Sequence, residues 1–514
     1  MESGLLAIKS HLSKLTPKPA DEKKFGDYIF KNLTFFLSEL PAEYNAQELN
    51  TYFERMNTSG KSLENYEILK VEVMKRLAAD KNLYAQVWNA VSIMEKTLLR
   101  RHKGEQESQL RLRYRNAILD IIENGDIRNV FESGKAKFDV DEDGADEAEA
   151  VAEPLSIGEI VPNSNNPFKI VKRRTEEHSP LFFSEFLLQV LYITIYKGMQ
   201  DTMDDGISNK ILGNPKDNGV HVTDFFDVRQ LEKTFKWAFE KRNLDAEQFV
   251  KNLALYRLLM DYFIIRIDDD GEEPYPFELY EGDSFKAHVE KYLSMLYSAS
   301  SAMTYYEWMP ALFLYLEDYV KTNKLLNLPA KEYLDKLKEL DNKWHPEEGL
   351  ESGKLDYQTI DRYWFWRMDY YLWENRDLFF SGKQVAVASN YIFRRNRSIE
   401  HIAPQHPKDE FGDQSRFHWD DENTSVRDCL GNMVMISSGQ NSSLSNSCFE
   451  VKRAVMERYS SGVDKGHVES LKMLYVYSKF KTWSIDNIIK HDEFTLDFLK
   501  ATYCDSESKM KSLA

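Results

Sequence analysis

The stretch from 397 to 452 constrains the fold of this chain more than any other part of it. It begins with RSIEHIAPQHP, in which an acid and a histidine, Glu400 and His401, stand next to each other just before a proline. An apolar run typical of a strand follows and carries Asn432, and a second asparagine, Asn441, comes shortly afterwards. A capping-box pattern then indicates a helix start. The stretch therefore predicts strand, loop, strand and helix, with the histidine on the first strand and Asn432 on the second.

This layout resembles the ββα-metal fold of the HNH (His-Me finger) nucleases. The segments EHIAPQ and CLGNMVMISSGQN are similar to the C-terminal domain of the GmrSD restriction endonucleases. The resemblance covers roughly 391–500. It implies a DNA endonuclease of a bacterial antiviral restriction system, of the type IV kind that acts on modified DNA. It also implies that Asn432 fixes the loop that orients the catalytic base.

The residue types suit phosphodiester hydrolysis. A histidine titrates near neutrality, so we assign His401 as the general base. Oxygen ligands suit Mg²⁺ or Mn²⁺, and we expect Glu400 and Asn441 to hold one such ion. Adjacent residues on a strand face opposite ways, so Glu400 and His401 share a site only if the strand twists or ends there. Pro404, which cannot donate to a ladder, favours such an end.

The first part of the chain, 1–134, is predicted to be helical. Its segment FERMNTSGKSL at 53–63 resembles the later part of the N-terminal GmrS domain, although it also fits a plain helix–turn–helix connection. We find no DGQQR-type nucleotide motif, and no glycine-rich cradle precedes Gly60-Lys61-Ser62. We therefore expect no nucleotide site in this chain. Either a separate GmrS-like subunit supplies nucleotide binding, or the chain is a diverged member of the family.

The fold class is predicted to be mainly α, with a small α+β nuclease core near the C-terminus. An acidic, proline-containing linker at 135–178 separates the N-terminal helices from an aromatic-rich helical middle domain at 179–390. The nuclease domain follows at 391–514. Within the middle domain, DRYWFWRMDYYLWEN at 361–375 is an aromatic stripe at helical spacing. It predicts a packed core, and the alternative of base stacking requires exposed rings.

The formal net charge of −17 argues against binding of a polyanion over the whole surface. DNA must then be held by local basic patches. One candidate cluster lies between 169 and 174. The second lies beside the predicted catalytic strand, and the nucleic-acid contacts that we predict there are Arg394, Arg395, Arg397 and Lys452.

The chain has three cysteines, which form neither a zinc pattern nor an even disulfide set, so we expect a reducing cytoplasmic location. The first residues lack the apolar core of a signal peptide, and the most apolar run, 181–196, is too short for a membrane span. We therefore expect DNA as a partner and no membrane.

Two other functions remain open on the sequence alone. The protein is a non-catalytic helical scaffold of a defence complex if its nuclease fold is inactive. The same site would also serve an RNA-cleaving toxin, and a comparison of DNA with RNA substrates separates that case.

Overall fold

The computed structural model describes residue 31 and most of the chain from 64 onward. The described ranges are 64–100, 102, 104–128, 179–199, 209–213, 216, 219–264, 285–300, 308–351, 355–406, 419, 423–460, 467–504 and 507–514. The FERMNTSGKSL stretch, the predicted linker and the basic cluster at 169–174 lie outside these residues. Asn65–Ala514 form one compact unit.

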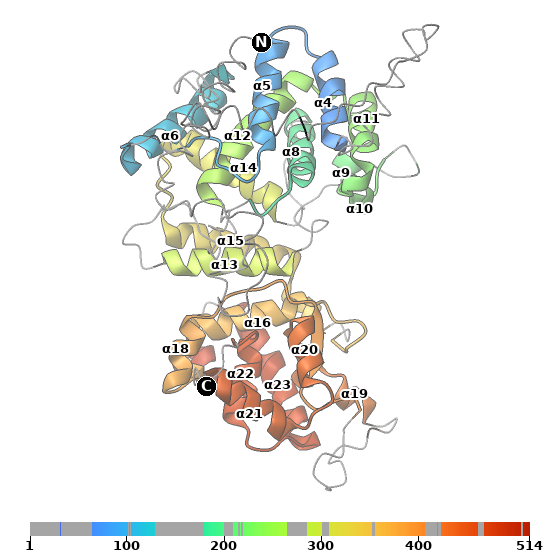
Figure 1. Ribbon diagram of the computed structural model, residues 1–514, viewed down its shortest axis with the longest axis vertical. Coiled ribbons are helices and arrows are strands. Elements are labelled where there is room, and N and C mark those ends of the chain that lie inside the picture. Colours follow the sequence, from blue (N-terminus) through green and yellow to red (C-terminus); the bar gives the residue numbers. More distant parts are fainter. Residues whose placement is uncertain are drawn as a thin grey trace. The chain divides into compact units, whose positions relative to one another are not determined.

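The described part of the chain is mainly helical, which confirms the predicted fold class at this level (Figure 1). The α-helices before the strands are α4 (Asn65–Lys75), α5 (Lys81–Ser92), α6 (Glu107–Asn124), α8 (Phe183–Gly198), α9 (Asn209–Leu212), α10 (Val222–Phe225), α11 (Leu231–Lys241), α12 (Ala246–Phe263), α13 (Lys286–Ala299), α14 (Met309–Asn323), α15 (Ala330–Trp344), α16 (Tyr363–Glu374), α17 (Arg376–Phe379) and α18 (Lys383–Ser389). The 3-10 helices are η3 (Val228–Gln230), η5 (Glu347–Glu351) and η6 (Leu430–Asn432). The C-terminal part contains β1 (Ser398–His401), α19 (Thr424–Arg427), β2 (Met433–Ile436), α20 (Ser438–Leu444), α21 (Phe449–Ser460), α22 (Leu471–Lys479), α23 (Ile485–Ala501) and α24 (Glu507–Leu513).

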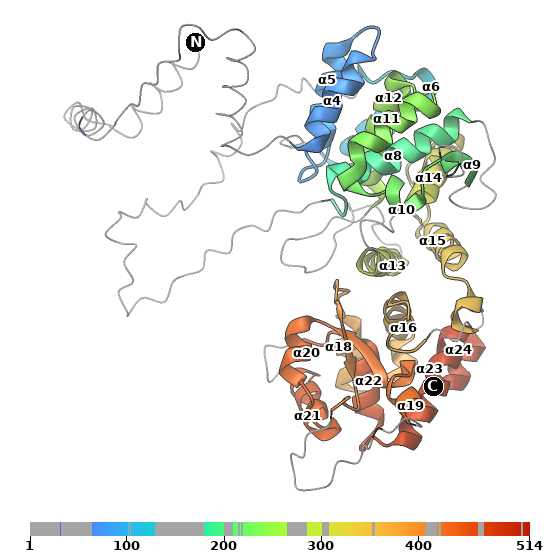
Figure 2. The ribbon, with the colours of Figure 1, turned by 90° about the vertical axis from the view of Figure 1, so that its right-hand side faces the viewer.

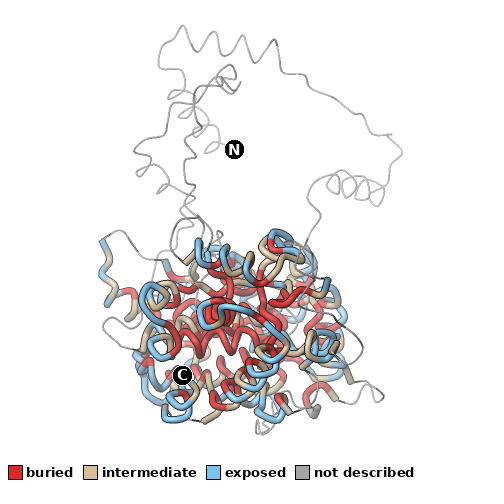
Figure 3. The backbone as a smooth tube through the Cα atoms, turned by 90° about the horizontal axis from the view of Figure 1, so that it is seen from below, coloured by how far each residue is buried: buried red, intermediate tan, exposed pale blue. Residues whose placement is uncertain are grey.

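Helix α12 is the central helix of the first group. Asp245 caps its N-terminus by accepting hydrogen bonds from the backbone N–H groups of Glu247 and Gln248, at 2.9 and 3.2 Å. Nearly all of its residues are buried because it packs against α5, α6, α8 and α14. Figure 3 shows such buried stretches running through the interior of the fold. A buried ion pair between Arg257 and Asp261 completes the core, and Arg257 also donates to backbone carbonyls at the end of α5 and just after it.

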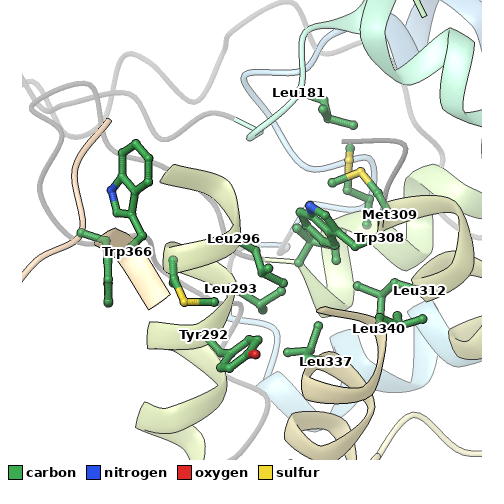
Figure 4. Close-up of a cluster of buried hydrophobic side chains, with 14 of the residues drawn as sticks. Leu181, Tyr292, Leu293, Leu296, Trp308, Met309, Leu312, Leu337, Leu340 and Trp366 are labelled. Carbon is green, nitrogen blue, oxygen red and sulfur yellow. The ribbon is translucent and has the colours of Figure 1, made fainter. Parts of the chain in front are cut away.

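Helices α13 and α15 pack against each other, and α16 packs on α13. Figure 4 shows the apolar part of this contact, with Leu293 and Leu296 of α13 near Leu337 and Leu340 of α15. The contact also contains a buried polar centre. The carboxylate of Asp341 accepts hydrogen bonds from the hydroxyls of two tyrosines and from a guanidinium, which belong to Tyr292, Tyr363 and Arg367.

The aromatic stripe lies on α16, and all its residues from Tyr363 to Trp373 are buried. The structure therefore confirms the predicted packed core, and these rings are not available for stacking on bases. Helix α16 also contacts α22 and α23, which lie beside it in Figure 2. Asp369 of α16 accepts hydrogen bonds from the backbone N–H of Lys472 and from the hydroxyl of Ser470. These contacts join α16 to the start of α22.

Strands β1 and β2 are antiparallel, with His401 opposite Met433 and Glu400 opposite Val434. Every residue of β2 is buried, which is why the strand is apolar throughout instead of alternating. The buried ammonium of Lys472 donates to the carbonyls of Leu430 and Met433, at 2.5 and 2.8 Å. The hairpin is thereby anchored to α22.

Turn η6 packs on α23. The backbone N–H of Gly431 donates to the Asp492 carboxylate at 2.6 Å, and a Cβ on Gly431 would lie 2.5 Å from the backbone of Asp492. Only glycine permits this approach.

Among the described residues, none of the helices combines the length and apolar character that crossing a lipid bilayer requires.

Candidate functional site

A polar pocket of about 170 Å³ opens at the end of β1. The predicted base His401 and the predicted metal ligands Glu400 and Asn441 all line it. Its remaining lining residues are Tyr357, Ile399, Pro404, Gln405, Ser445, Asn446 and Lys452. The structure thus brings four of the predicted site residues, Glu400, His401, Asn441 and Lys452, together from three separate elements of the chain.

Glu400 and His401 are the last two residues of β1, and both pair with β2, opposite Val434 and Met433. The pairing continues with one further hydrogen bond, from the backbone N–H of Ile402 to the carbonyl of Asn432 at 2.8 Å. Both neighbouring residues nevertheless line the pocket, which opens at the end of the strand.

The imidazole of His401 is almost fully enclosed. Its Nε2 lies 3.0 Å from Oδ1 of Asp428, and the Tyr357 ring lies 4.8 Å away, centroid to centroid. Burial lowers the pKa of His401 to about 4, although the hydrogen bond and charge of Asp428 act in the opposite direction. The ring is therefore neutral near pH 7, which is the form that accepts a proton.

The sequence analysis missed both Asp428 and Tyr357. Asp428 lies 27 positions from His401, and its side chain is held by Arg427, whose Nε lies 2.9 Å from Oδ1. Burial acts to raise the pKa of Asp428, but the Arg427 and His401 contacts lower it overall. An arginine–aspartate pair on a loop is common in any sequence, and nothing in its spacing indicates a contact with the histidine.

Lys452 has a different environment from the one that its prediction implies. We predicted it as a contact to nucleic acid, but its side chain is fully buried. Its Nζ lies 2.5 Å from Oε1 of Glu400 and donates to the carbonyl of His401 at 2.8 Å. Burial raises the pKa of Glu400, and the Lys452 ammonium partly opposes that shift. Lys452 therefore holds the end of β1 in place, and a contact to phosphate stays a prediction.

Asn432 is fully buried and lies in η6, immediately before β2, whereas the sequence analysis expected it on the strand. Its Oδ1 accepts hydrogen bonds from the Ala403 backbone N–H at 2.8 Å and from Trp483 Nε1 at 3.1 Å. Its Nδ2 donates to the carbonyls of Ala403 and Arg427, at 3.2 and 2.8 Å. Asn432 thus ties the loop after His401 to the loop that carries Asp428. It acts on the pocket through these loops because it does not line the pocket itself.

Asn441 lies on α20. Ser437 caps this helix by accepting from the Gln440 backbone N–H, and Glu469 in turn accepts from the N–H and hydroxyl of Ser437. The helix start is thereby fixed relative to the hairpin. The side-chain amide of Asn441 makes no hydrogen bond to another described residue, so its oxygen is available to a ligand in the pocket.

The donor set suits a hard cation that keeps other ligands. The described residues contain no group of three or more His, Cys, Asp and Glu side chains that would enclose a metal ion by themselves. Mg²⁺ commonly uses one or two protein oxygens and completes its shell with water and substrate phosphate. Glu400 and Asn441 supply two such oxygens in one pocket, so the residues present fit this kind of ion.

The predicted arginines precede β1 and have separate surroundings. An Arg394 guanidinium nitrogen lies 2.7 Å from Nε2 of His467, and the Arg395 guanidinium lies 3.9 Å over the ring of Tyr297. Arg395 and Arg397 are exposed, and Arg394 is half-buried. None of the three lines the pocket.

Comparison with known families gives one match. Residues 350–494 match the model of the C-terminal domain of the GmrSD restriction endonucleases. A comparison with curated proteins found no match. The matched segment contains all the residues that line the pocket, from Tyr357 to Lys452. Residues 350–494 are thus similar to this C-terminal domain, and the similarity supports membership of the GmrSD-type restriction endonuclease family.

Proposed function

We propose that the chain is a metal-dependent DNA endonuclease of the HNH type. In this proposal it acts in an antiviral restriction system of type IV and cleaves modified foreign DNA. The observation that carries the proposal is the shared pocket of His401, Glu400 and Asn441 at the end of the β1–β2 hairpin. The order of two antiparallel strands followed by helices α20 and α21 is similar to that of a ββα-metal core, which supports the proposal.

His401 would take a proton from the attacking water because its imidazole is neutral and lines the pocket. The water oxygen forms a bond to phosphorus while the opposite P–O bond breaks in line, which leaves a 3′ hydroxyl on one product. Glu400 and Asn441 would hold Mg²⁺ or Mn²⁺, which when bound supplies charge to the phosphate oxygens. Asn432 would keep the two loops of the site in register through its four hydrogen bonds.

Lys452 would add a fixed positive charge beside the carboxylate. Its ammonium neutralises Glu400 within the fold, so the pocket is not strongly negative before it receives a phosphate. We propose that the exposed Arg395 and Arg397 then contact the DNA backbone, and that a separate GmrS-like subunit supplies nucleotide binding.

The test is nicking of supercoiled plasmid with Mg²⁺ or Mn²⁺, by wild type and by His401→Ala, on unmodified and base-modified DNA. We expect the wild type to nick and His401→Ala to be slower by about 10²–10⁴-fold. His345→Ala provides a control, since His345 bonds to Asp341 in the buried polar centre of the helical part.

The competing function is a scaffold with an inactive nuclease fold, and the ion pair that already neutralises Glu400 favours it. Absence of cleavage by wild type, with a nucleotide-binding partner and both metal ions present, would support the scaffold. Faster cleavage of RNA than of DNA would instead support a toxin.

A further inference from the structure

Asp428 makes two contacts beside the proposed base, and the residue at one of them, Tyr357, also touches the base. Its Oδ1 lies 3.0 Å from Nε2 of His401, and its backbone carbonyl accepts a hydrogen bond from the N–H of Tyr357 at 3.0 Å. The Tyr357 ring in turn lies 4.8 Å from the His401 ring, at an interplanar angle of 53°. The imidazole is therefore held at its edge by Asp428 and packed against the tilted ring of Tyr357, whose backbone Asp428 anchors.

Asp428 is itself held rigidly. Arg427 donates to both of its carboxylate oxygens, with Nε 2.9 Å from Oδ1 and a terminal nitrogen 2.5 Å from Oδ2. The carbonyl of Arg427 accepts from Nδ2 of Asn432, which also binds both backbone groups of Ala403. The buried side-chain amide of Asn432 thus connects the segment that ends in Asp428 with the loop that follows His401.

This arrangement determines which ring nitrogen carries the proton. A carboxylate only accepts hydrogen bonds, so a neutral imidazole that faces Asp428 through Nε2 must donate from Nε2–H. The side-chain amide nitrogen of Gln405 also lies near Nε2, but its distance of 3.5 Å makes it a much weaker partner than the Asp428 carboxylate at 3.0 Å. The lone pair then resides on Nδ1, which makes no hydrogen bond to another described residue.

We propose that Asp428 is a positioning residue that fixes His401 as the Nε2–H tautomer and leaves Nδ1 as the base nitrogen. The inference deepens the proposed nuclease function and rests on it for its catalytic part. Carboxylate partners of histidine have this orienting effect in other sites, and their removal commonly lowers activity by about 10–100-fold.

The test uses the full chain with two substitutions of similar size. In Asp428→Asn, the side-chain oxygen can still accept from Nε2–H, so we expect only a small loss of kcat. In Asp428→Leu, no acceptor remains, and we expect kcat for plasmid nicking to fall by about 10–100-fold with KM unchanged. Asp492→Leu is the matched control. The Asp492 carboxylate accepts a hydrogen bond from the backbone N–H of Gly431, and Asp492 does not line the pocket.

A second measurement does not depend on cleavage. Long-range ¹H–¹⁵N spectra of histidine-labelled protein, with His401 assigned by its absence in His401→Ala, report which nitrogen is protonated. We expect Nε2–H in the wild type and in Asp428→Asn, and a tautomer mixture in Asp428→Leu.

The outcomes separate the two claims. An Nδ1–H tautomer in the wild type, or equal kcat for Asp428→Leu and wild type, would overturn the positioning role. The positioning role would also be overturned if kcat fell in both Asp428→Leu and Asp492→Leu in proportion to the loss of folded protein. If the wild type does not cleave, the nuclease proposal fails, and the spectra still decide whether Asp428 sets the tautomer.

Discussion

Nζ of Lys452 lies 2.5 Å from Oε1 of Glu400, and both side chains are buried in the wall of the pocket. One member of this pair was predicted to bind a cation and the other to bind a phosphate. The structure joins them to each other, and the Lys452 ammonium opposes the rise in the pKa of Glu400 that burial causes. Removing only one of two buried charges leaves an uncompensated ion in the fold.

We expect Lys452→Met to lower the free energy of unfolding by about 3–5 kcal/mol, because it leaves the Glu400 carboxylate without its partner. The double variant Lys452→Met/Glu400→Gln should recover most of this loss. Urea unfolding followed by circular dichroism measures both effects. Equal stability of the single and double variants would show that the pair is not coupled.

Gly431→Ala should destabilise the C-terminal domain by about 1–3 kcal/mol, because the new methyl group meets the α23 backbone at Asp492. Gly439→Ala is the matched control. Gly439 lies on α20 with only the Ser437 hydroxyl near, at 3.8 Å, so alanine there should be neutral or stabilise by up to about 1 kcal/mol. Thermal melting compares the two, and a similar loss in both would contradict the close approach.

Asn432→Ala should cost about 3 kcal/mol or more, since it leaves several buried backbone groups and the Trp483 indole N–H without partners. Asn441→Ala, in which the lost amide has no partner among the described residues, should change stability by less than about 0.5 kcal/mol. Calorimetry on the two variants checks this contrast. A cost for Asn441→Ala as large as that for Asn432→Ala would refute it.

The buried carboxyl group of Asp369 makes the stability of the fold depend on pH. Burial raises its pKa to about 7, against 3.8 for the ordinary carboxyl group, although hydrogen bonds from Lys472, Tyr391 and Ser470 oppose the shift. Between these values the folded chain holds a proton that the unfolded chain has lost, so this group's contribution to stability falls as pH rises from about 4 to about 7. Asp369→Asn should remove that component, which unfolding curves at several pH values would measure. An unchanged pH dependence in the variant would contradict the raised pKa.

Arg397→Gln should weaken DNA binding evenly across sequences if its guanidinium contacts a phosphate. The slope of log Kd against log salt should fall by about 1 in magnitude. Fluorescence anisotropy in the non-cleaving His401→Ala background measures this slope. Arg128→Gln, outside the family-matched domain, should leave it unchanged, and equal slopes for both variants would exclude the contact.

The helices could be predicted because their signals are local. Asp245 and Ser484 cap α12 and α23 as the sequence pattern indicates, since a cap needs only residues a few positions apart. The aromatic stripe on α16 could also be interpreted correctly, because eleven consecutive large residues cannot all remain exposed. The predicted domain boundaries remain predictions.

The site could be predicted only in part. The sequence by itself determined that His401, Glu400 and Asn441 belong to one motif, because their types and order resemble those of a known family. Only the tertiary structure decided that Asp428 holds the histidine, that Lys452 is buried against Glu400, and that Asn432 lies in a turn. These contacts join segments that approach each other when the hairpin packs on α21, α22 and α23. No periodicity along the chain encodes such contacts, since hydrogen bonds between distant loops depend on where the folded backbone places them.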